Sequence, residues 1–144
     1  MQLSEHFSLD ELTASETAAR NGWDNSPNLN ELSNLKRLAE FLEQVRTVLG
    51  KPIIVNSAFR SKLVNDAVGS RDSSQHRIGC AADIRVPGMT PDEVVKAVMA
   101  ADIGYDQIIR EFDRWTHISI PNNPEDKPRQ QALIIDRSGT RPYA

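Results

Sequence analysis

Two histidines and one aspartate have side chains of the types that bind a metal ion. His76 lies in the segment SSQHRIGCAAD, which ends at Asp83 seven residues later, and His117 lies in the segment EFDRWTHIS. Two imidazoles and one carboxylate form a common catalytic zinc site, whose fourth position stays open. A single histidine is more often an ordinary surface or core residue than a ligand. The residue types therefore predict a zinc site, with ordinary histidines as the alternative.

The segment between His76 and Asp83 favours their close approach. Gly79 lies between them and permits a tight turn of the backbone. Asp83 and His117 both fall within predicted strands. If these strands are neighbours in a sheet, His117 supplies the third ligand from across the sheet.

The composition excludes several other kinds of site. Cys80 is the only cysteine, so an intramolecular disulfide and a zinc site with several thiolates are both excluded. We expect Cys80 to pack as a small buried side chain. The third histidine, His6, lies in a polar N-terminal segment and is predicted to be a surface residue. The net charge of −3 and a pI near 5.6 argue against a dedicated nucleic-acid-binding protein.

The elements that must position these residues follow from the apolar spacing and from helix start and stop signals. Apolar residues recur at helical spacing over residues 29–49, and Gly50 and Pro52 end that helix. Thr90, Pro91 and Glu93 form a strong helix start. The remaining elements are less strongly marked. The predicted helices cover residues 9–14, 15–19, 29–49, 62–68 and 91–101, and the predicted strands cover 53–55, 80–86, 107–112, 115–120 and, as an edge strand, 133–135.

This order of elements predicts an α+β fold. We expect a small, largely antiparallel sheet with helices packed on one side and a single zinc site at the sheet. The length fits one domain over residues 1–144, with a helical and loop leader over 1–27 and a C-terminal loop and tail over 121–144. We also expect a monomer that does not insert into membranes and is synthesised in the cytoplasm without a signal peptide.

Three segments carry a resemblance to a known family. The segment from Ser74 to Asp83 fits the pattern S-x-H-x-x-G-x-A-x-D, and Glu111 to Ser119 fits E-x-x-x-W-x-H-x-S. The segment NSAFRS at residues 56–61 is similar to S-G-Y-R-S, with Ala and Phe in place of Gly and Tyr. In this order, the three segments resemble the zinc D-Ala-D-Ala carboxypeptidase family, which also contains phage endolysin peptidases.

The resemblance implies a role for each matching residue. His76, Asp83 and His117 would bind one zinc ion per chain, and Glu111 would be the general base. Arg60 would bind the substrate and help polarise the scissile carbonyl, a role that suits a planar cation able to grip a carboxylate in two places. Ser74 would support the site or contact the substrate. Trp115 is open to two interpretations, a wall of the substrate cleft or a core or edge aromatic residue.

One position departs from the family pattern. In several relatives the catalytic acid lies three residues before the last histidine ligand, but here that residue is Arg114, which cannot be a base. Two carboxylates remain nearby, Glu111 and Asp113. A hairpin turn over residues 113–115 would place Glu111 directly across from His117 and Asp113 in the turn, where aspartate is common. We therefore favour Glu111 as the base, with Asp113 as the alternative.

The implied function is hydrolysis of peptide bonds in bacterial peptidoglycan, either at a terminal D-Ala or inside a stem peptide or cross-link. A phage-type endolysin or a tail-associated lysin fits, acting on the cell wall after release or delivery. The alternative is a non-catalytic cell-wall-binding or virion structural module with a peptidase-like fold. A purely structural zinc domain fits less well, because structural zinc is normally held by four ligands, often thiolates.

Overall fold

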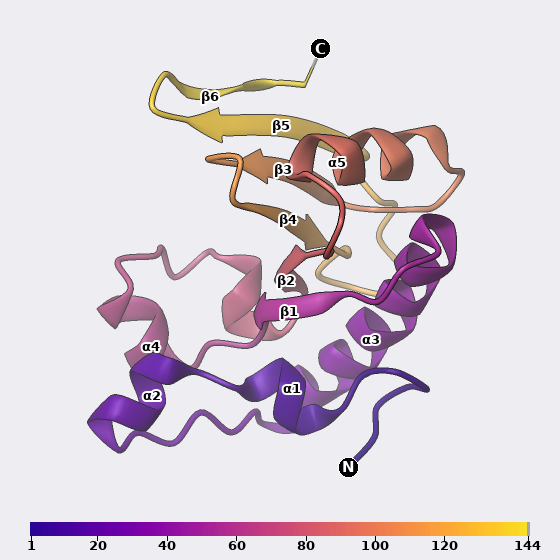
Figure 1. Cartoon of the computed structure of the whole chain (residues 1–144). Helices are drawn as coiled ribbons and strands as arrows, with labels where there is room; N and C mark the ends of the chain where they lie inside the picture. The colour runs from indigo at the N-terminus through magenta and orange to yellow at the C-terminus, as the bar shows by residue number, and fades with distance from the viewer. Residues whose placement is uncertain (144) are drawn as a thin grey trace.

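A computed structural model describes residues 1–143 and contains a six-stranded sheet with the strand order β1-β2-β4-β3-β5-β6 (Figure 1). All neighbouring strands are antiparallel except β3 and β5, which are parallel. The strands are β1 (Ile54–Ser57), β2 (Ala81–Arg85), β3 (Gln107–Glu111), β4 (Trp115–Ser119), β5 (Gln131–Asp136) and β6 (Gly139–Pro142). The helices are α1 (Leu9–Thr13), α2 (Glu16–Asn21), α3 (Leu29–Leu49), α4 (Lys62–Ala67), α5 (Pro91–Ala100) and the 3-10 helix η1 (Gln75–Ile78). The α+β class is confirmed.

The long helix α3 forms the centre of the hydrophobic core. A capping box between Asn28 and Glu31 starts it, and Gly50 ends it in a left-handed conformation. Most of its apolar side chains pack against apolar side chains of the sheet and of α5. Each side chain that is fully buried contributes roughly 1.5–3 kcal/mol to stability. The core includes Leu35, Leu38, Leu42 and Val45 of α3, Val94, Val95 and Val98 of α5, and Ile84, Ile108 and Ile118 of the sheet.

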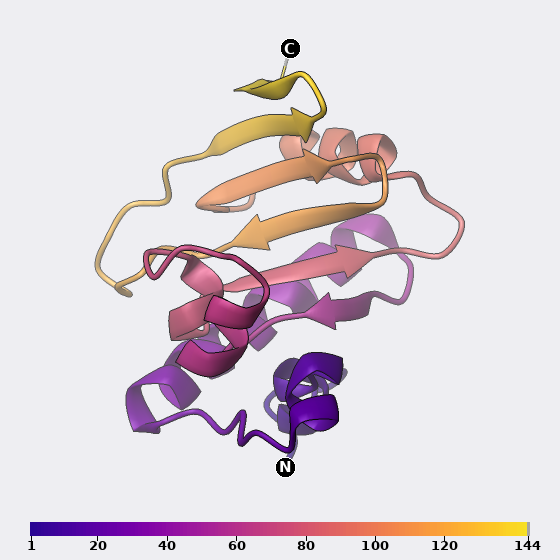
Figure 2. The same cartoon turned by 90° about the vertical axis from the view of Figure 1, so that its left-hand side faces the viewer.

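The two faces of the sheet have different coverings. Figure 2 shows α3 and α5 behind the sheet, on the face that carries the core residues of the strands. Since side chains alternate along a strand, Asp83 and His117 point to the opposite face, and they are paired across β2 and β4. Among residues 1–143, no helix has the length and apolar composition that a membrane crossing requires.

The C-terminal part of the chain differs from the expectation of a loop and tail. Residues 131–135 of β5 pair in parallel with β3, and β6 pairs with the other side of β5. A strand was expected at residues 133–135, but its predicted position at the edge of the sheet is wrong, because β5 is an interior strand. The sequence GTRP of β6 has no apolar alternation that could predict a strand. It is instead held by backbone pairing with β5 and by Arg141, which forms two hydrogen bonds of 2.8 and 2.9 Å with Asp136.

The hairpin between β3 and β4 also differs from the expected register. Glu111 pairs with Trp115, and His117 pairs with Ile109, so Glu111 is not directly across from His117. The turn has three residues, as expected, but it lies one residue earlier, over 112–114, where Phe112 and Asp113 both adopt left-handed conformations, with φ of 54° and 52°. Left-handed residues other than glycine cost roughly 1–2 kcal/mol each. The pairing is shifted by two residues, so Glu111 still lies on the same face as His117.

Gly79 is predicted to be required for stability, because it ends η1 at a close approach to α3. Its φ is +82°, and a Cβ there would lie 2.9 Å from the Glu31 carbonyl oxygen and 3.1 Å from Leu35 Cγ. We expect Gly79→Ala to lower the free energy of unfolding by about 2–4 kcal/mol, as measured by urea denaturation. Gly69→Ala is the matched control, because Gly69 has φ +75° but open space around its Cβ position. Equal losses for the two variants would show that the contact with α3 is unimportant.

Candidate metal centre

The three predicted metal ligands converge on the open face of the sheet. His117 of β4 lies beside Asp83 of β2, with 3.0 Å between His117 Nδ1 and Asp83 Oδ1. His76 of η1 approaches from outside the sheet, with its Nε2 3.2 Å from the same oxygen. One ligand atom from each residue lies within 4.8 Å of those of the other two, which is close enough to hold one metal ion.

The backbone around η1 fixes the orientation of His76. The hydroxyl of Ser74 accepts a hydrogen bond from the His76 backbone N–H at 3.3 Å and so caps η1. The His76 ring is buried, and its Nδ1 lies 2.6 Å from the carbonyl oxygen of Ala58. A carbonyl oxygen can only accept, so Nδ1 carries the hydrogen. Histidine ligands of metal ions are commonly held in this way through their other ring nitrogen.

The donor set fits zinc. Because Nδ1 of His76 donates its hydrogen to the Ala58 carbonyl, Nε2 of the neutral ring carries no hydrogen and presents a lone pair. This lone pair faces Oδ1 of Asp83, which is also an acceptor, at 3.2 Å. Two facing acceptors need a cation between them. Ligand atoms about 2.0–2.2 Å from a tetrahedral zinc ion lie roughly 3.3–3.5 Å apart, close to the separations found here. With three protein ligands, a bound zinc ion would keep one position open, as in catalytic zinc sites.

The charges at the site also suit metal binding. Burial lowers the pKa of His76, which keeps its imidazole in the neutral form that binds metals. Burial alone would raise the pKa of Asp83, but the His76 and His117 rings outweigh it and hold that pKa well below its usual range. At neutral pH the site therefore presents a neutral His76 imidazole and an ionised Asp83 carboxylate.

Arg60 lies next to this ligand set. Its Nη2 lies 3.5 Å from Asp83 Oδ2, the carboxylate oxygen that does not contact the histidines, and its backbone N–H donates to the carbonyl of His76. Further long contacts join its guanidinium to Ser57 and Asn65 at 3.4 and 3.5 Å. Burial lowers the pKa of Arg60, and the carboxylates of Asp83 and Glu111 oppose that effect. The guanidinium is therefore a partly buried cation beside the ligands.

The two candidate bases lie in different surroundings. Glu111 is half-buried on the face of the ligands, and burial together with the charge of Asp83 raises its pKa, against the opposing effects of His117 and Arg60. Asp113 lies in the turn, exposed, 3.2 Å from Nε of Arg110. A raised pKa improves proton exchange near neutral pH, so these surroundings favour Glu111 over Asp113 as the base.

A cleft extends from the ligands over the sheet. It has a volume of about 620 Å³ and includes His117 and Ser74 in its lining. Its other walls come from η1 and the loop before it, from β3, and from β5 and the loop before it, through Ser70, Arg71, Ser73, Gln75, Gln107, Arg129 and Ile135. Trp115 lies further along the same face, across from Glu111.

Sequence reasoning missed two features of the site. The Ala58 carbonyl that orients His76 is a backbone group, and residue types give no signal for it. The start of η1 is held by polar contacts: Gln75 Nε2 donates to the Ile120 carbonyl at 2.9 Å and to Asp106 at 3.2 Å, and Arg129 donates to the same carboxylate at 2.6 Å. Spacing in the sequence could not have predicted these long-range partners.

The one remaining histidine and the cysteine lie outside the site. Cys80 is buried, and burial raises the pKa of its thiol to about 11, which agrees with the expected packing role. His6 is a surface residue, as expected, and its Nδ1 lies 2.6 Å from Glu43 Oε1.

Comparison with known families agrees with this geometry. Residues 5–119 match the family described as Peptidase M15, and that range includes the three ligands, Arg60 and Glu111. Comparison with curated proteins finds no match. The family match covers most of the chain and supports the resemblance to zinc D-Ala-D-Ala carboxypeptidases. We conclude that the chain belongs to the Peptidase M15 family of zinc-dependent metallopeptidases.

Proposed function

We propose that this protein hydrolyses peptide bonds of bacterial peptidoglycan, in a stem peptide or cross-link that contains D-Ala. The observation that carries the proposal is the convergence of three zinc-ligand types, a half-buried carboxylate and a guanidinium on the open face of the sheet. Membership of a peptidase family gives the class of reaction. We further propose that it acts as a lysin of the phage endolysin or tail-associated type, reaching the cell wall after release or delivery.

In the proposed mechanism His76, Asp83 and His117 would hold zinc. Glu111 transfers protons, and Arg60 stabilises negative charge. When bound, zinc polarises the scissile carbonyl and lowers the pKa of a water molecule at the open position. Glu111 takes a proton from the attacking water and delivers it to the leaving amine, a transfer that its raised pKa favours. Arg60 stabilises the negative charge that grows on the carbonyl oxygen.

Digestion of purified peptidoglycan tests the function. We expect the zinc-loaded protein to release peptide products whose masses, measured by mass spectrometry, identify the cleaved bond, and we expect a chelator to stop the reaction. Binding to peptidoglycan without any product, under conditions where zinc is bound, would favour the alternative of a non-catalytic cell-wall-binding or virion module.

Arg60 is predicted to contribute to substrate binding and turnover more than to the stability of the fold. Arg60→Lys keeps the positive charge but loses the planar fork that grips a carboxylate or oxyanion in two places. We expect kcat/KM to fall at least tenfold, while the melting temperature stays near that of the unchanged protein, because the guanidinium contacts within the protein are long. A large loss of stability with normal turnover per folded molecule would make Arg60 a structural residue instead.

A further inference from the structure

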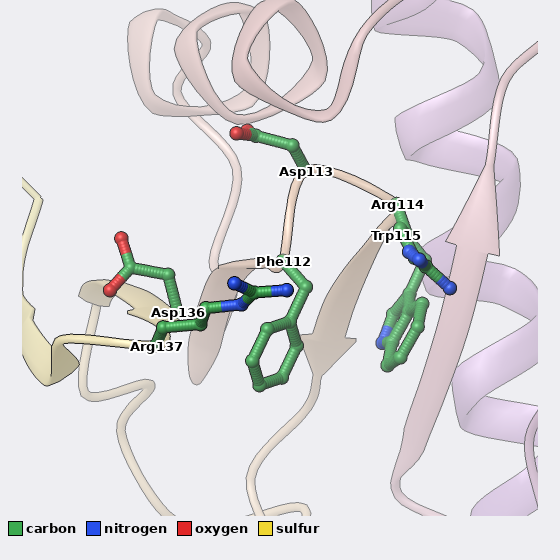
Figure 3. Close-up of a pocket in the computed structure, with 6 residues that line it drawn as sticks. All are labelled: Phe112, Asp113, Arg114, Trp115, Asp136 and Arg137. Atoms are coloured by element: carbon green, nitrogen blue, oxygen red, sulfur yellow. The ribbon is translucent and has the colours of Figure 1, made fainter.

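A second pocket lies at the end of the β3–β4 hairpin (Figure 3). We call it the hairpin pocket. Its volume is about 390 Å³, and it is lined by Phe112, Asp113, Arg114, Trp115, Asp136 and Arg137. Asp136 and Arg137 lie at the end of β5, beyond residues 5–119 that match the peptidase family. One wall of this pocket therefore comes from a part of the chain that the family match does not cover.

The hairpin pocket is close to the reacting groups. Trp115 precedes the ligand His117 by two residues on β4, so the two side chains share a face and are separated by roughly 7 Å along the strand. Trp115 also pairs across the hairpin with Glu111. Since one extended residue spans about 3.3–3.6 Å, a peptide at the metal centre reaches this pocket within about two or three residues of the scissile bond.

The pocket has an uncompensated positive charge. Asp113 pairs with Arg110 at 3.2 Å, and in Figure 3 it points away from the Phe112 ring. Asp136 is neutralised by two hydrogen bonds from Arg141. Neither of the two lining arginines, Arg114 and Arg137, has a carboxylate within ion-pair distance among residues 1–143. Figure 3 shows the guanidinium of Arg137 directed toward Phe112. The charge balance therefore favours an anionic ligand.

The aromatic side chains add an apolar wall. The rings of Phe112 and Trp115 lie 6.3 Å apart, tilted by 48°, and Phe112 is 46% exposed. The backbone N–H of Phe112 donates to the carbonyl of Ile135 at 2.8 Å, which attaches the hairpin turn to β5. Two rings beside the guanidinium of Arg137 suit a ligand that has an aliphatic part and a carboxylate.

We propose that the hairpin pocket is a specificity subsite for a free carboxylate of the substrate peptide, a proposal that rests on the proposed peptidase function. Arg137 pairs with the carboxylate, and Phe112 and Trp115 pack against the aliphatic atoms next to it. The subsite selects peptides with a carboxylate within two or three residues of the cleaved bond over the same peptides with a neutral or cationic group there.

Matched synthetic stem peptides test the subsite. One pair carries D-glutamate or its α-carboxamide at the second position, and the other carries diaminopimelate or lysine at the third. We expect the zinc-loaded protein to cleave the carboxylate member of at least one pair with a kcat/KM roughly 3- to 10-fold higher. Arg137→Gln is expected to remove this preference, mainly by lowering kcat/KM for the carboxylate member of the pair, whereas Arg137→Lys retains part of the preference.

Arg46→Gln is the matched control, since it makes the same charge change on α3, which packs against the other face of the sheet. It is expected to keep the full preference. Equal rates within both pairs for the unchanged protein, or an equal effect of Arg137→Gln on both members, would overturn the subsite while leaving the peptidase function intact. Failure to cleave any of the four peptides, with zinc bound, would overturn the proposed function and the subsite with it.

Discussion

Glu111→Gln is expected to lower kcat for peptide hydrolysis roughly 10²–10⁴-fold, the usual cost of losing a general base. Glutamine keeps the shape and reach of the side chain but cannot accept the proton. Zinc content is expected to stay at one ion per chain, because Glu111 is not among the three clustered ligands. The rate is measured on one muropeptide with metal content determined in the same samples, so that a loss of metal is not mistaken for a loss of the base.

Asp113→Asn is the matched control for the base. Asp113 is exposed in the hairpin turn, and asparagine tolerates the left-handed conformation found there. We expect this variant to keep most of the activity. An inactive Asp113→Asn beside an active Glu111→Gln would exchange the two roles. Full activity in both variants would mean that neither carboxylate is the base.

His76→Ala is expected to remove zinc and reduce hydrolysis to background. In the proposed site the ring would supply one of three ligand atoms, and the Ala58 carbonyl holds the ring in place, so a solvent molecule could not replace it in the same orientation. Zinc per chain is measured by elemental analysis after dialysis, alongside activity. Because His76 is buried, the melting temperature is compared with that of the metal-free unchanged protein.

His6→Ala is the control for His76→Ala. It removes an exposed histidine that contacts Glu43, outside the metal centre, and is expected to keep both zinc and activity. Full zinc occupancy in His76→Ala would remove His76 from the ligand set.

The parts of the fold that could be predicted from the sequence are those fixed by local signals. The bounds of α3 follow from its cap residues, its apolar spacing and the glycine that ends it. The pairing of β2 with β4 was expected from the proposal that Asp83 and His117 share a site, and these two residues do pair. Residue type and motif spacing therefore gave the metal-ligand candidates.

The parts that could not be predicted depend on contacts between distant residues. The parallel pairing of β3 with β5 needs a crossover through residues 112–130, and nothing in the local pattern distinguishes it from an antiparallel edge. The hairpin register depends on left-handed conformations at Phe112 and Asp113, for which asparagine and glycine are the usual signals. The hairpin pocket forms where this turn meets the end of β5, so it too could not be predicted from the sequence.

The most direct test of the central claim, a zinc site formed by His76, Asp83 and His117, is a crystal structure of the zinc-loaded protein with diffraction data collected on both sides of the zinc absorption edge. We predict one anomalous difference peak per chain, about 2.0–2.2 Å from a ring nitrogen of each histidine and from a carboxylate oxygen of Asp83. A fully zinc-loaded protein whose anomalous peak lies elsewhere, away from these three side chains, would contradict the account.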